Sequence, residues 1–238
     1  MSLVYKLMTI FIACLALPLF MCTGMLYIII ITLIPSKRFY ATNLAARFIL
    51  FFLGAKMVIN KPFPGGGPYF VMYNHTSFID AFIFFSFASG KFTGIAAKKN
   101  FKIPIFGWMA KKFKAIPIER GNLKSSIKSL EKAEKRLTEG YHICILPEGT
   151  RSLDGKMLEF KKGGFHMAIN TKAQILPIGI SGAFTYKPKN RWFLKPGPVY
   201  VNIGDPIDAS QYSIDSIQDL INTTYQHINS LSKSTDNV

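Results

Sequence analysis

An uncharged run near the start of the chain limits what this sequence can fold into. Between Leu7 and Pro35 there is no Asp, Glu, Lys or Arg. A helix of that length would extend about 44 Å, against about 30 Å for the hydrocarbon core of a bilayer. Secretory signals have a much shorter apolar region, so we expect this segment to be retained. It is predicted to be a tilted transmembrane helix or, if Pro18 breaks it, a re-entrant or interfacial helical pair.

Charges on either side of this run predict its orientation. Only Lys6 precedes it, whereas Lys37, Arg38, Arg47 and Lys56 follow it. Because cytoplasmic flanks are enriched in Lys and Arg, we expect an integral or monotopic membrane protein whose remaining chain lies on the cytoplasmic side.

One clear boundary follows, the Pro- and Gly-rich stretch 61–68. It predicts an N-terminal membrane-anchoring helical segment over 1–60 and a globular domain over 61–238. The apolar stretch from Phe48 to Val58 is too short to span a bilayer, and we expect it to lie along the membrane or to cover the core.

Beyond residue 68, strand-like and helix-like runs alternate. Leu130 and Leu137 share a face with Leu123 and Ile127 in a helix that Gly140 ends. A C-terminal amphipathic helix is marked by Ile214, Ile217, Leu220, Ile221, Tyr225, Ile228 and Leu231. The expected strands are Tyr69–Tyr73, Thr93–Ala97, Ala115–Ile118, His142–Leu146, Ile175–Ile180 and Val199–Ile203. This alternation predicts an α/β fold, a mainly parallel sheet flanked by helices.

The net charge of +16 favours anionic partners such as lipid headgroups, phosphorylated substrates or acidic carrier proteins. No nucleic-acid partner is expected, because the basic residues are dispersed and no nucleic-acid-binding module is recognisable. Cys14, Cys22 and Cys144 are interpreted as packing residues, and the sequence has no apparent set of metal ligands.

His75 and Asp80 are the first candidate catalytic residues. Residues five apart on a continuous helix are rotated by about 140°, so the two side chains would not meet there. They can pair if His75 precedes a helix and Asp80 lies in its first turn. His75 would then be a general base whose ring is oriented by the carboxylate of Asp80. The alternative is structural: Asp80 closes a capping box that begins at Ser77.

The segment Leu146–Ser152 supplies a guanidinium and a glycine-exposed backbone, which are typical of a phosphate site. Ligands of parallel sheets gather at the carboxyl ends of the strands. Asn74-His75, Glu119-Arg120 and this segment each follow an expected strand, so we expect them to converge. The pattern indicates proton abstraction from a hydroxyl of a phosphate-bearing substrate.

Three further segments complete a recognisable set: Lys102–Trp108, Ala115–Arg120 and Gln174–Gly179. In this order and spacing, the chain from about Pro68 to Pro177 resembles the glycerolipid acyltransferases, specifically the bacterial-type 1-acyl-glycerol-3-phosphate acyltransferases. Two departures are visible. Leu146 stands where the family usually has Phe, and Glu119 stands where Asp is more usual.

The resemblance implies transfer of an acyl group from a thioester of coenzyme A or acyl carrier protein to lysophosphatidic acid. The product would be phosphatidic acid, a step of phospholipid biosynthesis, and no cofactor would be needed. His75 would act as the general base and Asp80 would fix its tautomer. Another acceptor, such as a lysophospholipid or a lyso-ornithine lipid, stays open.

The same resemblance assigns the acceptor site. Arg151, with the backbone N–H groups of Gly149 and Thr150, would hold the acceptor phosphate, and Arg120 would assist. Glu148 would organise the site or bind the acceptor.

Two other functional classes fit parts of the sequence. Gly179–Ala183 nearly matches the nucleophile elbow of a serine hydrolase, with Asp205 or Asp208 and then His227 in the required order. That class needs a helix directly after the serine, and the Pro-containing run 184–198 does not predict one. A non-catalytic membrane-surface protein would also fit the anchor and the charge. It would not need the His75–Asp80 pair.

Overall fold

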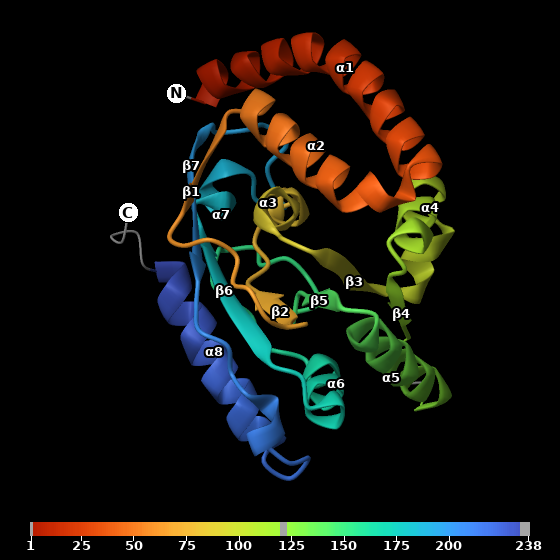
Figure 1. Ribbon diagram of the computed structural model, residues 1–238. Helices are drawn as coiled ribbons and strands as arrows, with labels where there is room; N and C mark the ends of the chain where they lie inside the picture. The colour runs from red at the N-terminus through yellow and green to blue at the C-terminus, as the bar shows by residue number, and fades with distance from the viewer. Residues whose placement is uncertain (1, 120–122, 234–238) are drawn as a thin grey trace.

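A seven-stranded sheet forms the centre of the computed structural model, which describes residues 2–119 and 123–233 (Figure 1). The strands occur in the order β1, β7, β6, β2, β5, β3, β4. Five neighbours from β6 to β4 run parallel, whereas β7 is antiparallel to β6 and parallel to β1. The bounds are β1 Ala55–Ile59, β2 Phe70–Tyr73, β3 Lys91–Ala97, β4 Ile116–Ile118, β5 Tyr141–Ile145, β6 Ile175–Ser181 and β7 Gly197–Ile203. The predicted α/β fold with a mainly parallel sheet is confirmed.

Helices cover both faces of this sheet. The α-helices are α1 Ser2–Leu33, α2 Arg38–Phe52, α3 Asp80–Phe87, α4 Pro104–Lys112, α5 Leu123–Thr138, α6 Gly163–Thr171, α7 Ala183–Tyr186 and α8 Ile217–Lys233. In Figure 1, α2 and α3 lie on one side of the sheet with α1 arching over them, and α5, α6 and α8 lie on the other.

The two faces of β2 show how the sequence builds two cores. Val71 and Tyr73 point into a core shared with α2 and α3. Phe70 and Met72 point into the opposite core, which is shared with α5, α6 and α8. All four side chains are at most 1% exposed. A central parallel strand is buried on both faces, and its sequence is therefore apolar throughout rather than alternating.

The N-terminal helices are joined to the domain by specific contacts. The guanidinium of Arg38 donates to the hydroxyl of Tyr141 at 2.6 Å and to the carbonyl of Lys112 at 3.2 Å. Asn43 and Arg47 donate to the carbonyl of Ser86 in the last turn of α3, at 2.9 and 2.8 Å. Since the last carbonyls of a helix have no partner within it, α2 supplies the C-terminal cap of α3.

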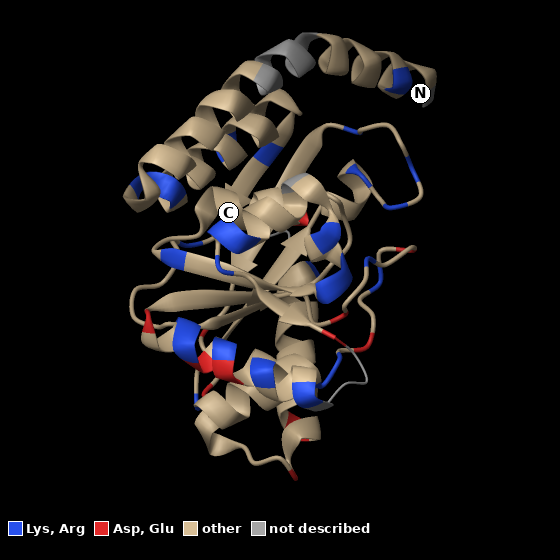
Figure 2. Ribbon diagram, turned by 90° about the vertical axis from the view of Figure 1, so that its right-hand side faces the viewer, with Lys and Arg blue, Asp and Glu red and all other residues tan. Residues whose placement is uncertain are grey.

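The membrane prediction can be compared with the helices. In the described part of the chain, no single helix is both long and apolar enough to cross a bilayer. Two consecutive helical stretches, 22–33 and 35–52, are long and apolar enough when taken together, but the chain bends by 118° between them. Lys6, near its start, is the only charged residue in the sequence of α1, and Figure 2 shows the rest of the described helix without Lys, Arg, Asp or Glu. The membrane segment and the boundary between 60 and 61 stay predictions.

Three details of the sequence prediction were wrong. The stretch Phe48 to Val58 is not one segment: it contains the end of α2 and most of β1, which pairs with β7. Ile127 is 51% exposed, because it lies about 60° around α5 from the inward-facing Leu130. Ile214 is 46% exposed and precedes α8.

Candidate active site

The His75–Asp80 pair forms in the turn between β2 and α3. Nδ1 of His75 lies 2.8 Å from Oδ2 of Asp80, the first residue of the helix. The same oxygen accepts hydrogen bonds from the backbone N–H groups of Thr76 and Ser77, both at 2.8 Å. Asp80 therefore orients the histidine and also caps the turn, so the two alternatives from the sequence hold together. The other half of the capping box is absent among the described residues: the Ser77 hydroxyl accepts from the N–H of Ile79 at 3.4 Å rather than from that of Asp80, and it donates to the carbonyl of Lys187 at 2.7 Å.

Burial determines the electrostatics of the pair. The Asp80 side chain is fully buried, whereas that of His75 is 20% exposed. Burial raises the pKa of Asp80, and the hydrogen bonds from His75, Ser77 and Thr76 oppose that rise. An ionised Asp80 accepts a hydrogen bond from Nδ1–H of His75, which leaves Nε2 as the nitrogen that can take a proton. The geometry is that of a general base.

Glu148 holds the backbone of His75 in place. Its Oε1 accepts from the N–H of His75 at 2.6 Å, and its Oε2 accepts from the N–H of Leu158 at 2.8 Å. In addition, the N–H of Ser152 donates to the carbonyl of His75 at 2.9 Å. Glu148 is 1% exposed, and burial raises its pKa. With both oxygens occupied by backbone donors, this carboxylate is arranged to organise the site.

Asn74 provides a second clamp, which the sequence analysis did not assign. Its amide nitrogen donates to the carbonyl of Ile180 at 2.8 Å, and its amide oxygen accepts from the N–H of Ile180 at 2.8 Å. The side chain thus continues the pairing of β2 with β6 by one step beyond the strand. An asparagine directly after a buried strand was the available signal.

The loop after β5 carries Arg151, next to Ser152, whose N–H donates to the carbonyl of His75. Gly149 has φ = 71°, a conformation that favours glycine. Its N–H donates to the carbonyl of Leu146 at 3.0 Å and is therefore already engaged within the loop, and its predicted use for a phosphate stays a prediction. The N–H of Thr150 has no acceptor among the described residues, and Thr150 is exposed. Arg151 is half-buried. Arg120 lies outside the described residues.

Lys187 brings a second cation toward Arg151. It lies in the basic stretch after α7, and its carbonyl receives the hydroxyl of Ser77 at 2.7 Å. Burial and then the positive charges of Arg151 and Arg191 lower the pKa of the Lys187 ammonium group. Among the described residues, neither Arg151 nor Lys187 forms an ion pair, and neighbouring cations without such partners favour an anionic ligand. The sequence alone did not assign Lys187 a role.

The remaining sequence candidates are not brought together here. Glu119 forms an ion pair with Lys98 at 2.9 Å at the far end of the sheet. A short helix, α7, does follow Ser181, contrary to expectation. Within the part of the chain that the structure describes, however, the Ser181 hydroxyl has no hydrogen-bond partner, and His227 is exposed on α8. The geometry therefore gives no serine–histidine pair.

Comparisons with known proteins agree with this geometry. The family model described as Acyltransferase matches residues 55–181. A 1-acyl-sn-glycerol-3-phosphate acyltransferase from Limnanthes douglasii is 33% identical over 149 residues, which is 62% of this chain and 53% of the relative. One from Pseudomonas aeruginosa is 34% identical over 146 residues, which is 60% of this chain and 55% of the relative. The chain thus spans about half the length of the curated relatives it matches.

A solved structure has the same fold. The crystal structure of the 1-acyl-sn-glycerophosphate (LPA) acyltransferase PlsC from Thermotoga maritima superposes with a TM-score of 0.78, covering 95% of each chain at 23% identity.

Proposed function

Taking as a premise that this chain belongs to the Acyltransferase family, we propose that it transfers an acyl group from a thioester to the free hydroxyl of 1-acyl-glycerol-3-phosphate. The observation that carries the proposal is the His75–Asp80 pair, whose loop is hydrogen-bonded to the backbone of Lys187 through Ser77 and to Ser152, the residue after Arg151. The names of the relatives from Limnanthes and Pseudomonas support the same reaction and acceptor. The donor would be a thioester of coenzyme A or of acyl carrier protein.

The chemistry needs only the groups already described. Nε2 of His75 takes the proton of the acceptor hydroxyl as the hydroxyl oxygen attacks the carbonyl carbon of the thioester. The C–S bond then breaks, and the protonated His75 returns the proton to the departing thiolate. Asp80 stabilises the imidazolium that exists between these two transfers.

Transfer would be direct. Cys144 is the cysteine nearest to the site in sequence, but burial raises its pKa to about 12, which keeps it an unreactive thiol. The Ser181 hydroxyl lacks a base among the described side chains. No acyl-enzyme is therefore part of the proposed mechanism.

The acceptor phosphate would bind between the guanidinium of Arg151 and the ammonium group of Lys187, with the N–H of Thr150 as a further donor. Arg120 stays a candidate for the same role. Glu148 and Asn74 would act as positioning residues, since both engage backbone groups rather than open space.

The lipid acceptor and the apolar N-terminal segment support a membrane location. The uncharged run from Leu7 to Pro35 would insert into the bilayer, with the domain on the cytoplasmic side. Membrane lipids would then be both the partners and the source of the acceptor.

The test measures incorporation of a labelled acyl group from acyl-CoA into a panel of lysolipids by membranes containing this protein. His75→Ala should lower the rate about 10²–10⁴-fold, the range for loss of a positioned general base. His227→Ala, an exposed histidine on α8, is the matched control and should keep the wild-type rate. Near-normal turnover by folded His75→Ala would reject the mechanism, and a different preferred lysolipid would correct the acceptor.

A further inference from the structure

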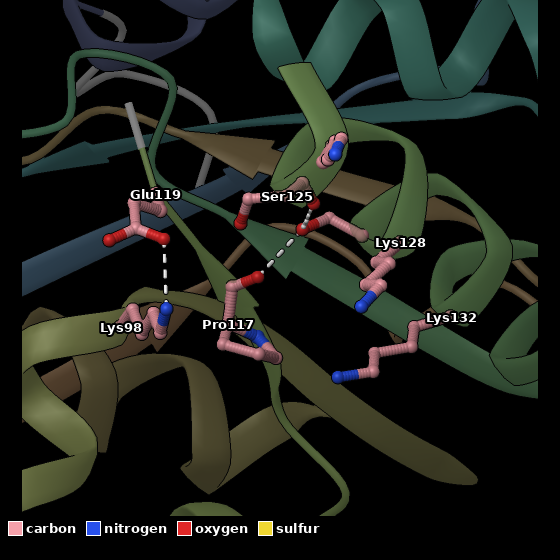
Figure 3. A pocket seen from close by; sticks show the side chains of 8 residues that line it. Lys98, Pro117, Glu119, Ser125, Lys128 and Lys132 are labelled. Carbon is pink, nitrogen blue, oxygen red and sulfur yellow. Dashed lines mark hydrogen bonds and ion pairs between the residues drawn. The ribbon is translucent and has the colours of Figure 1, made fainter. Parts of the chain in front are cut away.

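A lysine-rich pocket lies between the end of β4 and the first turns of α5. Its cavity volume is about 270 Å³, and it is lined by Lys98, Pro117, Glu119, Lys124, Ser125, Lys128, Ser129 and Lys132. Figure 3 shows Lys128 and Lys132 reaching from α5 toward β4, with Lys98 and Glu119 on the opposite side. The hydroxyl of Ser129 fixes the two walls together by donating to the carbonyl of Pro117 at 2.7 Å.

The lysines of α5 are placed where they do not help the fold. Lys124, Lys128 and Lys132 follow one another at intervals of four residues, and like charges at this spacing destabilise a helix. The first turn of α5 has no acidic residue, although negative charge is favoured there. In the described part of the chain, Glu119 pairs with Lys98 and none of these three lysines has an ion-pair partner. Their arrangement is therefore better explained by an anionic ligand.

The pocket lies at the carboxyl ends of β3 and β4, because Lys98 and Glu119 directly follow these strands. The strands β2, β5, β3 and β4 are consecutive and parallel, so their carboxyl ends lie along one edge. Three strand spacings separate β4 from β2, which is roughly 14 Å. The pantetheine arm of coenzyme A has about as many chain atoms as four to five residues, an extended reach of about 16 Å. A thioester beside His75 would thus place its nucleotide phosphates near β4.

We infer that this pocket binds the phosphorylated nucleotide of an acyl-coenzyme A donor, with Lys124, Lys128 and Lys132 as the residues that recognise it. The inference rests on the proposed function, because it assigns the donor of that reaction. A concave pocket between a strand end and a helix fits a small ligand, whereas an acidic carrier protein would need a broader exposed surface. Its volume suits part of a nucleotide, with the remainder lying along the exposed face of α5.

The first experiment measures binding without catalysis. Adenosine 3′,5′-bisphosphate is titrated into the purified full-length protein in detergent by calorimetry. The double variant K128Q/K132Q should bind about tenfold more weakly, and the wild-type affinity should fall as salt is raised. The control is Lys135→Gln, an exposed lysine of α5 outside the pocket. Equal affinity of the double variant and wild type overturns the inference even if the enzyme is active.

The second experiment compares donors. The KM for acyl-CoA should rise about tenfold in K128Q/K132Q, while the rate with an acyl-pantetheine, which lacks the nucleotide, and the KM for lysophosphatidic acid should stay at wild-type values. A raised KM for lysophosphatidic acid would assign the lysines to the acceptor, and a raised KM for acyl-carrier protein alone would assign them to a protein donor. Either result overturns the inference. If no donor is used but the bisphosphate binds through these lysines, the pocket stands and the proposed function fails.

Discussion

Replacing Glu148 by glutamine tests whether this residue positions His75 or contacts the acceptor. In the wild type, two backbone N–H groups, those of His75 and Leu158, point at the two carboxylate oxygens at 2.6 and 2.8 Å. Glutamine has one amide oxygen and one NH2 group. It can therefore accept from only one of the two, and its NH2 group must face the other donor.

The unpaired N–H group determines how much stability and activity the variant should lose. Leaving one buried N–H without an acceptor destabilises a protein by about 1–3 kcal/mol. For a chain of this size, that lowers the melting temperature by roughly 3–10 °C. Displacing His75 by a fraction of an ångström should also lower kcat at least about tenfold, since about 1 Å of misplacement costs up to about 10²-fold.

The assay combines thermal unfolding with steady-state kinetics. We expect Glu148→Gln to melt lower and to lose kcat, with an unchanged KM for lysophosphatidic acid. Glu159→Gln makes the same chemical change at an exposed carboxylate one residue beyond Leu158, and it should match the wild type. A Glu148→Gln protein with normal stability, normal kcat and a raised acceptor KM would show that Glu148 contacts the substrate.

Three further outcomes are expected. Arg151→Lys keeps the positive charge but loses the planar guanidinium that can bond two phosphate oxygens at once, so the KM for lysophosphatidic acid should rise far more than the KM for the donor. Equal effects on both KM values, together with a lower melting temperature, would show that Arg151 only stabilises the loop. Burial raises the pKa of Asp80, so the folded protein binds a proton at this carboxyl group more tightly than the unfolded chain does. The stabilisation from this proton is fully present below the ordinary carboxyl pKa and is lost as pH rises through the raised pKa. On lowering pH from 7 to 4, the melting temperature of the wild type should therefore gain relative to Asp80→Asn, and a constant difference would contradict the pKa direction. Membrane binding should survive concentrated salt, because salt does not screen the hydrophobic effect; release by salt alone would show that residues 7–35 are not inserted.

Most of the sheet could be predicted from the sequence because its strands are locally distinctive. Short apolar runs bounded by Gly, Pro or polar residues mark β2 to β7 within one or two residues of their observed bounds. In contrast, β1 adjoins the apolar end of α2, and its partner β7 lies about 140 residues away in the chain. Only that distant pairing distinguishes it from the end of a membrane segment, so no local pattern could reveal it.

The candidate site divides in the same way. The His75–Asp80 pair is local, and a capping argument about five residues was enough to expect it. The clamps are not local: Glu148 reaches His75 across 73 residues, and Asn74 reaches Ile180 across 106. Lys187 meets Ser77 across 110 residues. A sequence pattern can suggest that such side chains share a sheet edge, but which backbone group each one engages is decided by the packing of the strands.

The cap that α2 places on α3 has a consequence for how this protein can be shortened. A version lacking residues 2–33 would keep Asn43, Arg47 and β1, and with them the donors for the last turn of α3. A version beginning at residue 61 would lose those donors and leave β7 as a bare sheet edge, open to pairing with other chains. Because α3 begins at Asp80, loosening its far end would also loosen the carboxylate that orients His75. Deletion as far as residue 60 should therefore yield an aggregating and inactive polypeptide rather than a freely soluble catalytic domain.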